Sequence, residues 1–345
     1  MRERIYNLEF TFGVLAFNSE EFILQTLESI KYQIDMYGSG VDIDFVLVDD
    51  ASTDRTWYLI EKWIEHNREY FRSTVLLKNE RNRGTSYSYC KLIENVKTEY
   101  FIKIDGDDLF SSENIISKCF EVDVDECIIL LPFRFNENGV YYCYENIVDA
   151  YFYANTRHTH KRDLHVMETI KPFMTPQVII KRMHFTKECL DFVKKFVVFE
   201  DDPSIFYILR DNNMMKMKYL LEPFVLYRVH NKSVSNGVTS ISQLKFLDDL
   251  HMYNKYVLRN ERNIFVKAYL LFETMESFLM KHRFSANNCP NRIVAKRLYK
   301  TREKKSQNSP SFSEFIDRIE DIKCKENDYL NLIYKRANSF GIEIN

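Results

Sequence analysis

Apolar and polar positions follow two different periods over the first hundred residues, and the alternation between them predicts a strand–helix order. Apolar residues recur at helical spacing at Ile23, Leu27, Ile30 and Ile34, and again at Trp57, Ile60 and Ile64. Buried strands are predicted by the apolar stretches within residues 8–17, 41–50, 73–79 and 99–105. Strands separated by helices predict an α/β fold with a mostly parallel central sheet flanked by helices.

The polar residues after the first run predict where the first helix begins. Asn18 and Ser19 are residue types that cap helix N-termini, and Glu20 and Glu21 follow them. Acidic side chains are stabilised in the first turn of a helix by the helix dipole. We therefore expect this helix to begin directly after the first strand.

The rest of the chain is less regular and then becomes helical. Further strands are predicted within residues 125–135, 176–185 and 221–236. After residue 241 the pattern is helical, and Phe312, Phe315, Ile319 and Ile322 share one apolar face. We divide the chain into segments 1–110, 111–240 and 241–345.

Composition limits the classes of function. The chain has 345 residues, 45% of them hydrophobic, and a net charge of −2, so no overall field attracts nucleic acid. Its seven cysteines form no CxxC pair, which favours reduced thiols over disulfides. The first residues lack the apolar core of a signal peptide, and no apolar run reaches the ~18 residues of a membrane span. We therefore expect a cytoplasmic protein.

Polar side chains collect where the predicted strands end. Asp49 and Asp50 end the second strand, residues 81–84 follow the third, and residues 105–108 follow the fourth. Ligands of doubly wound sheets bind beyond the carboxyl ends of the strands. This edge of the sheet is therefore the expected site.

Three carboxylates, Asp105, Asp107 and Asp108, crowd into four positions. Such crowding is costly without a cation. A helix N-terminus explains one acid but not three. Oxygen ligands in this arrangement favour Mn²⁺ or Mg²⁺ with open positions for a diphosphate. Neither GxGxxG nor GxxxxGK[ST] occurs in the first βα unit, which argues against dinucleotide and P-loop sites.

These motifs together resemble family 2 glycosyltransferases of the GT-A fold. The resemblance rests on "FGVLAFNSEEFILQTLESIKYQ", "DFVLVDDASTDRT", "RNRG" and "EYFIKIDGDD", in that order, and covers residues 8–115. Weaker similarity follows at "FEDD" and "YRVHNKSVSN". It implies a nucleotide-sugar-binding half (1–110), an acceptor-binding half (111–240) and a helical C-terminal extension (241–345).

The resemblance also implies roles for individual residues. Phe17 is expected to stack on uracil, Asp50 to recognise the uracil edge and Asp105 to lie near the ribose. Asp107 is expected to ligate the metal, which His230 approaches in some members of the family. In the pair Glu200-Asp201, the aspartate corresponds to the catalytic base. The remaining nucleotide-binding candidates are Asn18, Glu20 and Arg83.

Two departures from the family pattern concern the diphosphate. Leu15-Ala16 stands where the family often has Pro-Thr, and Tyr89-Cys90 where it often has Arg-Asn. The diphosphate is therefore expected to be held differently, with Arg83, Lys103 or a residue of the last third as the compensating cation.

The resemblance implies an inverting, metal-dependent glycosyltransferase. We expect a sugar to move from a UDP-sugar to a hydroxyl of a glycan or lipid-linked glycan, in surface polysaccharide or lipopolysaccharide synthesis. Residues 281–305 carry nine Lys and Arg and one acid, so they are a candidate contact with an anionic membrane at its inner face. A non-catalytic nucleotide-sugar-binding or scaffolding protein of the same fold is the alternative.

Overall fold

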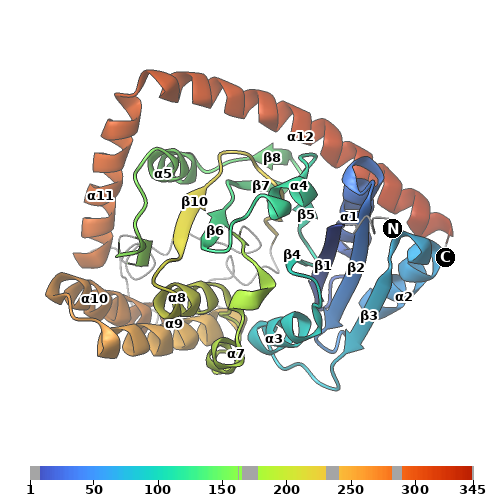
Figure 1. The fold of residues 1–345 in the computed structure, drawn as a ribbon, viewed down its shortest axis with the longest axis horizontal. Coiled ribbons are helices and arrows are strands. Elements are labelled where there is room, and N and C mark those ends of the chain that lie inside the picture. Colours follow the sequence, from blue (N-terminus) through green and yellow to red (C-terminus); the bar gives the residue numbers. More distant parts are fainter. Residues whose placement is uncertain (1–7, 162, 165–177, 231–240, 282–289, 344–345) are drawn as a thin grey trace, which may run out of the picture.

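The computed structural model (Figure 1) has the predicted α/β architecture. It describes residues 8–161, 163–164, 178–230, 241–281 and 290–343. The first strands are β1 (Leu8–Ala16), β2 (Val41–Asp49), β3 (Ser73–Lys78) and β4 (Tyr100–Asp105). The helices between them are α1 (Ile23–Tyr37), α2 (Thr56–Asn67) and α3 (Thr85–Asn95), and a 3₁₀ turn, η1 (Arg68–Tyr70), follows α2.

The central sheet is parallel throughout, in the order β3-β2-β1-β4. Ala16 of β1 is in register with Asp49 of β2, and Leu15 is in register with Asp105 of β4. The carboxyl ends of β1, β2 and β4 therefore meet at one edge, as the sequence predicted.

Both faces of this sheet are buried, which explains why its strands are continuous apolar runs. Phe12 packs on one face with Leu27 of α1 and Trp63 of α2. Val48 packs on the other face with Leu92 of α3. Helices on both faces leave only the strand ends open for a ligand.

The second half of the domain forms two smaller sheets, in the orders β10-β6-β9 and β5-β11-β7-β8. Their strands are β5 (Leu109–Phe110), β6 (Glu126–Ile129), β7 (Pro132–Asn136), β8 (Gly139–Tyr141), β9 (Val178–Ile179), β10 (Lys216–Tyr219) and β11 (Val225–Arg228). The helices here are α4 (Ile115–Phe120), α5 (Tyr144–Ala154), α7 (Lys187–Val193) and α8 (Asp201–Asp211).

Two strand predictions in this half are corrected. Residues 125–135 form two strands in different sheets, β6 and β7, because the chain changes sheet before Pro132, which has no N–H for a ladder. In 176–185 only Val178–Ile179 is a strand, a 3₁₀ turn (η2, Arg182–His184) follows, and 176–177 lie outside the described residues.

The C-terminal region is helical, as predicted, with α9 (Ile241–Asn260), α10 (Ile264–Lys281), α11 (Pro290–Gln307) and α12 (Pro310–Glu343). Figure 1 shows α12 crossing the molecule back to the first half. It packs on β8 of the second half and on α1 of the first. The predicted apolar face of α12 is buried at Phe312, Phe315 and Ile319. Within the described ranges, no helix is both long and apolar enough to cross a bilayer.

One buried carboxylate fastens α12 beside the site. Glu326 accepts hydrogen bonds from the backbone N–H of Ser112 (3.1 Å) and from its hydroxyl (2.6 Å). Burial raises the pKa of Glu326 to about 7. Ser112 follows β5, so this contact connects the last helix to the segment that leaves the acidic turn.

Replacing Glu326 by alanine is expected to lower the free energy of unfolding by about 1–3 kcal/mol, because two buried donors of Ser112 lose their acceptor. Urea unfolding at pH 6, where the carboxyl group of the wild type is largely neutral, measures the change. Glu314→Ala, at an exposed position of the same helix, is the control and should change stability by less than about 0.5 kcal/mol. Equal losses in both variants would contradict the assignment.

Candidate active site

Backbone hydrogen bonds tie the strand ends into one edge. The N–H of Asp50 donates to the carbonyl of Ala16 (2.8 Å), and the N–H of Gly106 donates to that of Leu15 (2.7 Å). The loops that follow β2 and β4 are therefore both fixed to the end of β1. The candidate residues of the loops after β1, β2 and β4 therefore lie at the same edge of the sheet.

The loop after β1 departs from the prediction. Asn18 has a positive φ of 48°, its Oδ1 accepts from Thr53 N (2.9 Å), and Ser19 N donates to Thr56 Oγ1 (2.7 Å). The predicted Asn18-Ser19 cap is therefore wrong, since the helix begins at Ile23 with Phe22 as N-cap. Contacts with the β2–α2 loop have displaced the local capping preference, and they hold two site loops together.

Phe17 and Glu20 lie in this same loop. The Phe17 side chain is 46% exposed, an unusual placement for a large apolar residue at a buried strand end. Glu20 Oε2 accepts from Arg55 N (2.9 Å) at the start of α2. The exposed ring suits a stacking surface, whereas Glu20 already connects two loops. Their roles toward a nucleotide stay predictions.

Asp50 is held by the turn after β3. Its Oδ1 accepts from the side-chain amide of Asn79 (2.7 Å) and from the N–H of Arg83 (2.8 Å). Its Oδ2 accepts from the N–H of Gly84 (2.8 Å). The carboxylate is 5% exposed, so it orders the 79–84 turn besides any contact with a base.

The exposed Arg83 and the buried Gly84 occupy this turn. The Arg83 guanidinium lies 4.4 Å from the ring centre of Tyr87. Gly84 has φ +88°, and a Cβ there would lie 2.3 Å from the carbonyl oxygen of Val197. Only glycine permits this approach, which brings the start of α3 against the segment that leads into Glu200.

The acidic turn 105–108 connects β4 to β5 and is not a helix N-terminus, because the next helix begins at Ile115. Asp108 is 1% exposed, and its Oδ1 accepts from the N–H of Arg228 (2.8 Å). Its Oδ2 is buried and has no hydrogen-bond partner. Burial raises the pKa of Asp108 well above its usual value, and the charge of Asp107 adds to the shift.

Asp107 and His230 meet, as the resemblance implied. His230 Nε2 lies 2.9 Å from Asp107 Oδ2, and the imidazole packs on the ring of Phe22 at 4.8 Å. Both side chains are partly exposed, at 32% for Asp107 and 18% for His230. Residues 231–236 of the motif that contains His230 lie outside the described residues.

This pair fits a divalent ion. Within the described residues, no three His, Cys, Asp or Glu side chains form a ready-made metal cluster. Mg²⁺ and similar ions that act on phosphates need only one or two protein ligands, because substrate oxygens and water complete the shell. A carboxylate beside an imidazole, both partly exposed, meets that requirement.

Arg228 is a site residue that carried little signal in the sequence. Its Nε donates to the carbonyl of Asp107 (2.6 Å), and its guanidinium lies 4.5 Å from the ring centre of Phe22. It is 6% exposed and also donates to Gln25 of α1 (2.6 Å). Its position two residues before His230 on a strand was the available clue.

Lys103 connects the acidic turn to the second acidic pair. Its Nζ lies 3.0 and 3.1 Å from the carboxylate oxygens of Asp105, and 3.4 Å from Glu200 Oε1. The Lys103 side chain is 4% exposed, so it is an interior cation and not a surface group for the diphosphate. Burial lowers its pKa, but Asp105, Glu200 and Asp201 outweigh burial and hold the pKa well above its usual value.

The second acidic pair opens α8. Burial, and after it the charge of the neighbouring Asp201, raises the pKa of Glu200 to about 8, against the pull of Lys103. Burial raises the pKa of Asp201 to about 6, and both Lys103 and a hydrogen bond with Glu200 oppose that shift. Near neutral pH the pair therefore holds one proton, on Glu200, and Asp201 is a carboxylate.

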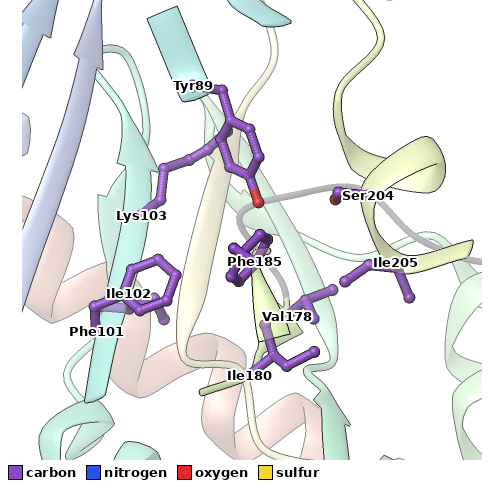
Figure 2. A pocket seen from close by; sticks show the side chains of 9 residues that line it. All are labelled: Tyr89, Phe101, Ile102, Lys103, Val178, Ile180, Phe185, Ser204 and Ile205. Atoms are coloured by element: carbon purple, nitrogen blue, oxygen red, sulfur yellow. The ribbon is translucent and has the colours of Figure 1, made fainter. Parts of the chain in front are cut away.

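Tyr89 occupies the place of the family's arginine. Figure 2 shows its hydroxyl directed from α3 towards Ser204 of α8, with Lys103 beside it. The Lys103 Nζ lies 5.8 Å from the Tyr89 ring centre. The cavity in Figure 2, about 20 Å³, has room for one water molecule and not for a sugar. Tyr89 is therefore a buried residue beside Lys103 and Ser204.

Comparison with known proteins identifies the family of the chain. The family model described as glycosyl transferase family 2 matches residues 11–186. A teichoic acid poly(glycerol phosphate) polymerase of Staphylococcus epidermidis is 31% identical over 102 residues, which is 30% of this chain and 13% of the polymerase. The match therefore spans a small part of that relative.

Solved structures share the fold at low identity. S. aureus TarS 1–349 in complex with UDP-GlcNAc has a TM-score of 0.56 at 16% identity, covering 97% of this chain and 89% of that one. The mannosyltransferase PcManGT from Pyrobaculum calidifontis, in complex with GDP-Man and Mn²⁺, has a TM-score of 0.53 at 14% identity, covering 98% and 87%. The family model covers half of the chain, and on this ground the chain belongs to glycosyltransferase family 2.

Proposed function

We propose that this protein is an inverting glycosyltransferase that moves a sugar from a UDP-sugar to a hydroxyl of a surface glycan. One observation carries the proposal: the end of β4 is connected to both candidate pairs. Asp107, which follows β4, contacts His230, and Lys103 of β4 contacts Glu200 of the Glu200-Asp201 pair. A group that can hold a diphosphate and a group that can accept a proton are thus joined by one turn.

The donor class is supported by the relatives and by the first loop. TarS structures contain UDP or UDP-GlcNAc, and the PcManGT structure contains GDP-Man. We infer that Phe17, Asn18, Glu20, Asp50, Arg83 and Asp105 form the nucleotide site. The 46% exposed ring of Phe17 supports stacking on a base. Asp50, whose carboxylate holds the turn that carries Arg83, is included because of the family resemblance.

Asp107 and His230 are the proposed ligands of Mn²⁺ or Mg²⁺. When bound, the ion would neutralise the leaving diphosphate as a Lewis acid. Arg228 Nε donates a hydrogen bond to the carbonyl of Asp107, which fixes the turn that carries the Asp107 carboxylate. This preorganisation matters because a shift of ~1 Å in a catalytic group can cost about 10²-fold in rate.

Asp201 is the proposed catalytic base. A positioned carboxylate takes the proton of the acceptor hydroxyl as the oxygen attacks the anomeric carbon and the diphosphate leaves from the opposite face. One base and no covalent intermediate give inversion in a single displacement. Glu200, protonated near neutral pH, donates a hydrogen bond to Asp201 and keeps it ionised.

The rate should depend on pH through this pair. The value of kcat/KM is expected to rise as Asp201 ionises near pH 6 and to change again as Glu200 ionises near pH 8. Lys103, Asp105, Asp202 and Tyr89 are the other titratable groups facing the pair. Glu200→Gln should keep the lower transition, because Glu200 is already neutral there, and should remove the upper one. If the transition near pH 8 is unchanged in Glu200→Gln, it belongs to a group other than Glu200.

UDP release tests the proposed activity. The wild type, incubated with Mn²⁺ and a panel of UDP-sugars, should hydrolyse one of them slowly in the absence of acceptor. Asp107→Ala should lose this release, and Asp123→Ala, which changes an exposed carboxylate away from the edge, should retain it. Binding of a UDP-sugar without release under any condition would favour the scaffolding alternative.

The remaining assignments follow from this proposal. The acceptor is a glycan or lipid-linked glycan, in keeping with the teichoic acid polymerase and TarS among the relatives. Segments 1–110 and 111–240 are the proposed donor and acceptor halves, and 241–345 the helical region. We place the protein in the cytoplasm, with residues 281–305 at the inner face of the membrane, of which 282–289 lie outside the described residues.

A further inference from the structure

An exposed apolar stripe runs along α10. The side chains of this α10 stripe are 39–82% exposed: Ile264, Phe265, Leu271, Phe272, Met275 and Phe278. Their spacing of one, six, one, three and three residues keeps them on one side of the helix. From Ile264 to Phe278 the stripe is about 21 Å long, at 1.5 Å per residue. Scattered apolar residues are ordinary on a surface, but a continuous stripe marks a contact.

The stripe is not the face by which α10 joins the domain. Val266 and Leu270 are buried in the core cluster that contains Tyr253 and Val257 of α9. Helix α10 is therefore packed on one side and apolar on the exposed side as well. A helix that contacts only its own domain would carry polar residues on that exposed side.

Exposed positive charge lies on the next helix. The exposed cations of α11 are Lys296, Arg297, Lys300, Lys304 and Lys305, and two exposed apolar residues, Ile293 and Leu298, lie among them. Arg302 is excluded from this surface, because it is paired with Asp149 at 2.7 Å. Figure 1 shows α11 leading away from the end of α10, and the two helices are in contact.

We propose that the α10 stripe and the α11 cations together bind an anionic lipid surface. Interfacial helices bury an apolar face at the boundary between headgroups and acyl chains, and cations beside them add attraction to anionic lipid. A second copy of the chain is less well matched, because it would bring its own exposed α11 cations against those of the first copy. Anionic headgroups supply the missing negative charge. The benefit to catalysis, proximity to a lipid-linked acceptor, rests on the proposed function, but the binding does not.

Vesicle sedimentation tests the inference on the full chain. The wild type should bind vesicles that contain phosphatidylglycerol, and bind vesicles of phosphatidylcholine alone at least about tenfold more weakly. Phe265→Ser combined with Phe278→Ser should lower binding at least about tenfold. Met183→Ser, at a 60% exposed apolar position on another element, is the matched control and should bind as the wild type does.

The charge contribution has its own variant. Lys296→Gln, Lys300→Gln and Lys304→Gln combined should remove the preference for anionic vesicles and the salt dependence of binding. UDP release in solution, measured on the same variants, should equal that of the wild type. If the proposed function is wrong, release is absent from every variant while vesicle binding still reports on the inference.

Three results would overturn the lipid contact. The first is a wild type that binds neither vesicle. The second is binding that the two serine substitutions leave unchanged. The third is a wild type that light scattering shows to be a dimer, which the serine substitutions dissociate, with no vesicle binding; the stripe would then be an interface between copies of the chain.

Discussion

Replacing Asp201 by asparagine is expected to lower kcat about 10²–10⁴-fold, because the acceptor hydroxyl would lose the proposed catalytic base. The amide keeps the size of the side chain and its place at the start of α8. Affinity for the nucleotide should stay near that of the wild type. Lys103 lies between Asp201 and the turn that carries Asp107, so the substitution should not disturb that turn. Multiple-turnover UDP release and a separate measurement of UDP affinity distinguish the two effects.

A second carboxylate of the same helix provides the control. Asp211 ends α8 at an exposed position, and Asp211→Asn should keep both rate and affinity. A rate for Asp201→Asn within a few fold of the wild type would exclude Asp201 as the base. Loss of nucleotide affinity together with rate would instead indicate a structural role in the donor site.

Replacing Lys103 by methionine is expected to lower the free energy of unfolding by about 3–5 kcal/mol at pH 8, because removal of one partner leaves buried charges uncompensated. Glu200 has a side-chain exposure of 6%, so it has little access to water in place of the cation. UDP release should fall as well, since the pKa of Asp201 would rise further without Lys103.

The effect of this substitution on stability should depend on pH in a defined direction. The pKa of Glu200 is raised in the folded state above its usual 4.5, so the folded state binds the proton more tightly than the unfolded chain. Stability from this group is present at low pH and is lost as pH rises towards 8. In Lys103→Met the pKa of Glu200 should be higher still, so stability is lost up to a higher pH. The difference in free energy of unfolding between variant and wild type should therefore shrink as pH falls towards 5.

Urea unfolding at pH 5 and pH 8 measures this dependence. Lys62→Met removes a lysine from an exposed pair with Glu65 and should change stability by less than about 1 kcal/mol at either pH. Equal stability of Lys103→Met and wild type at pH 8 would show that the lysine does not balance the carboxylates.

The central sheet could be predicted because its strands are buried on both faces. The strands contain uninterrupted apolar stretches such as residues 45–48, and the helices between them have a clear apolar face. The start of α1 could not be predicted from local preference, because Asn18 and Ser19 bond to the β2–α2 loop in place of the helix. The break within 125–135 depends on which strand each half pairs with, and that is set by distant residues.

Site residues that directly follow a predicted strand could be predicted from the sequence, whereas those that depend on contacts with distant residues could not. Asp50, Asp105 and Asp107 follow strands directly, so the parallel order alone brings them to one edge. The interior role of Lys103 could not be predicted, because its partner Glu200 is 97 residues away. Arg228 was hidden for the same reason, since its contacts with the acidic turn join the two halves of the domain.

Calorimetric titration of UDP in the presence and absence of Mn²⁺ is the most direct test of the account. The wild type should bind UDP at least about tenfold more tightly with the metal, because Asp107 and His230 would hold an ion that also neutralises the diphosphate. Asp107→Ala should bind UDP equally weakly in both conditions. Binding of UDP by the wild type that Mn²⁺ and Mg²⁺ leave unchanged, or metal-dependent tightening that persists in Asp107→Ala, would contradict it.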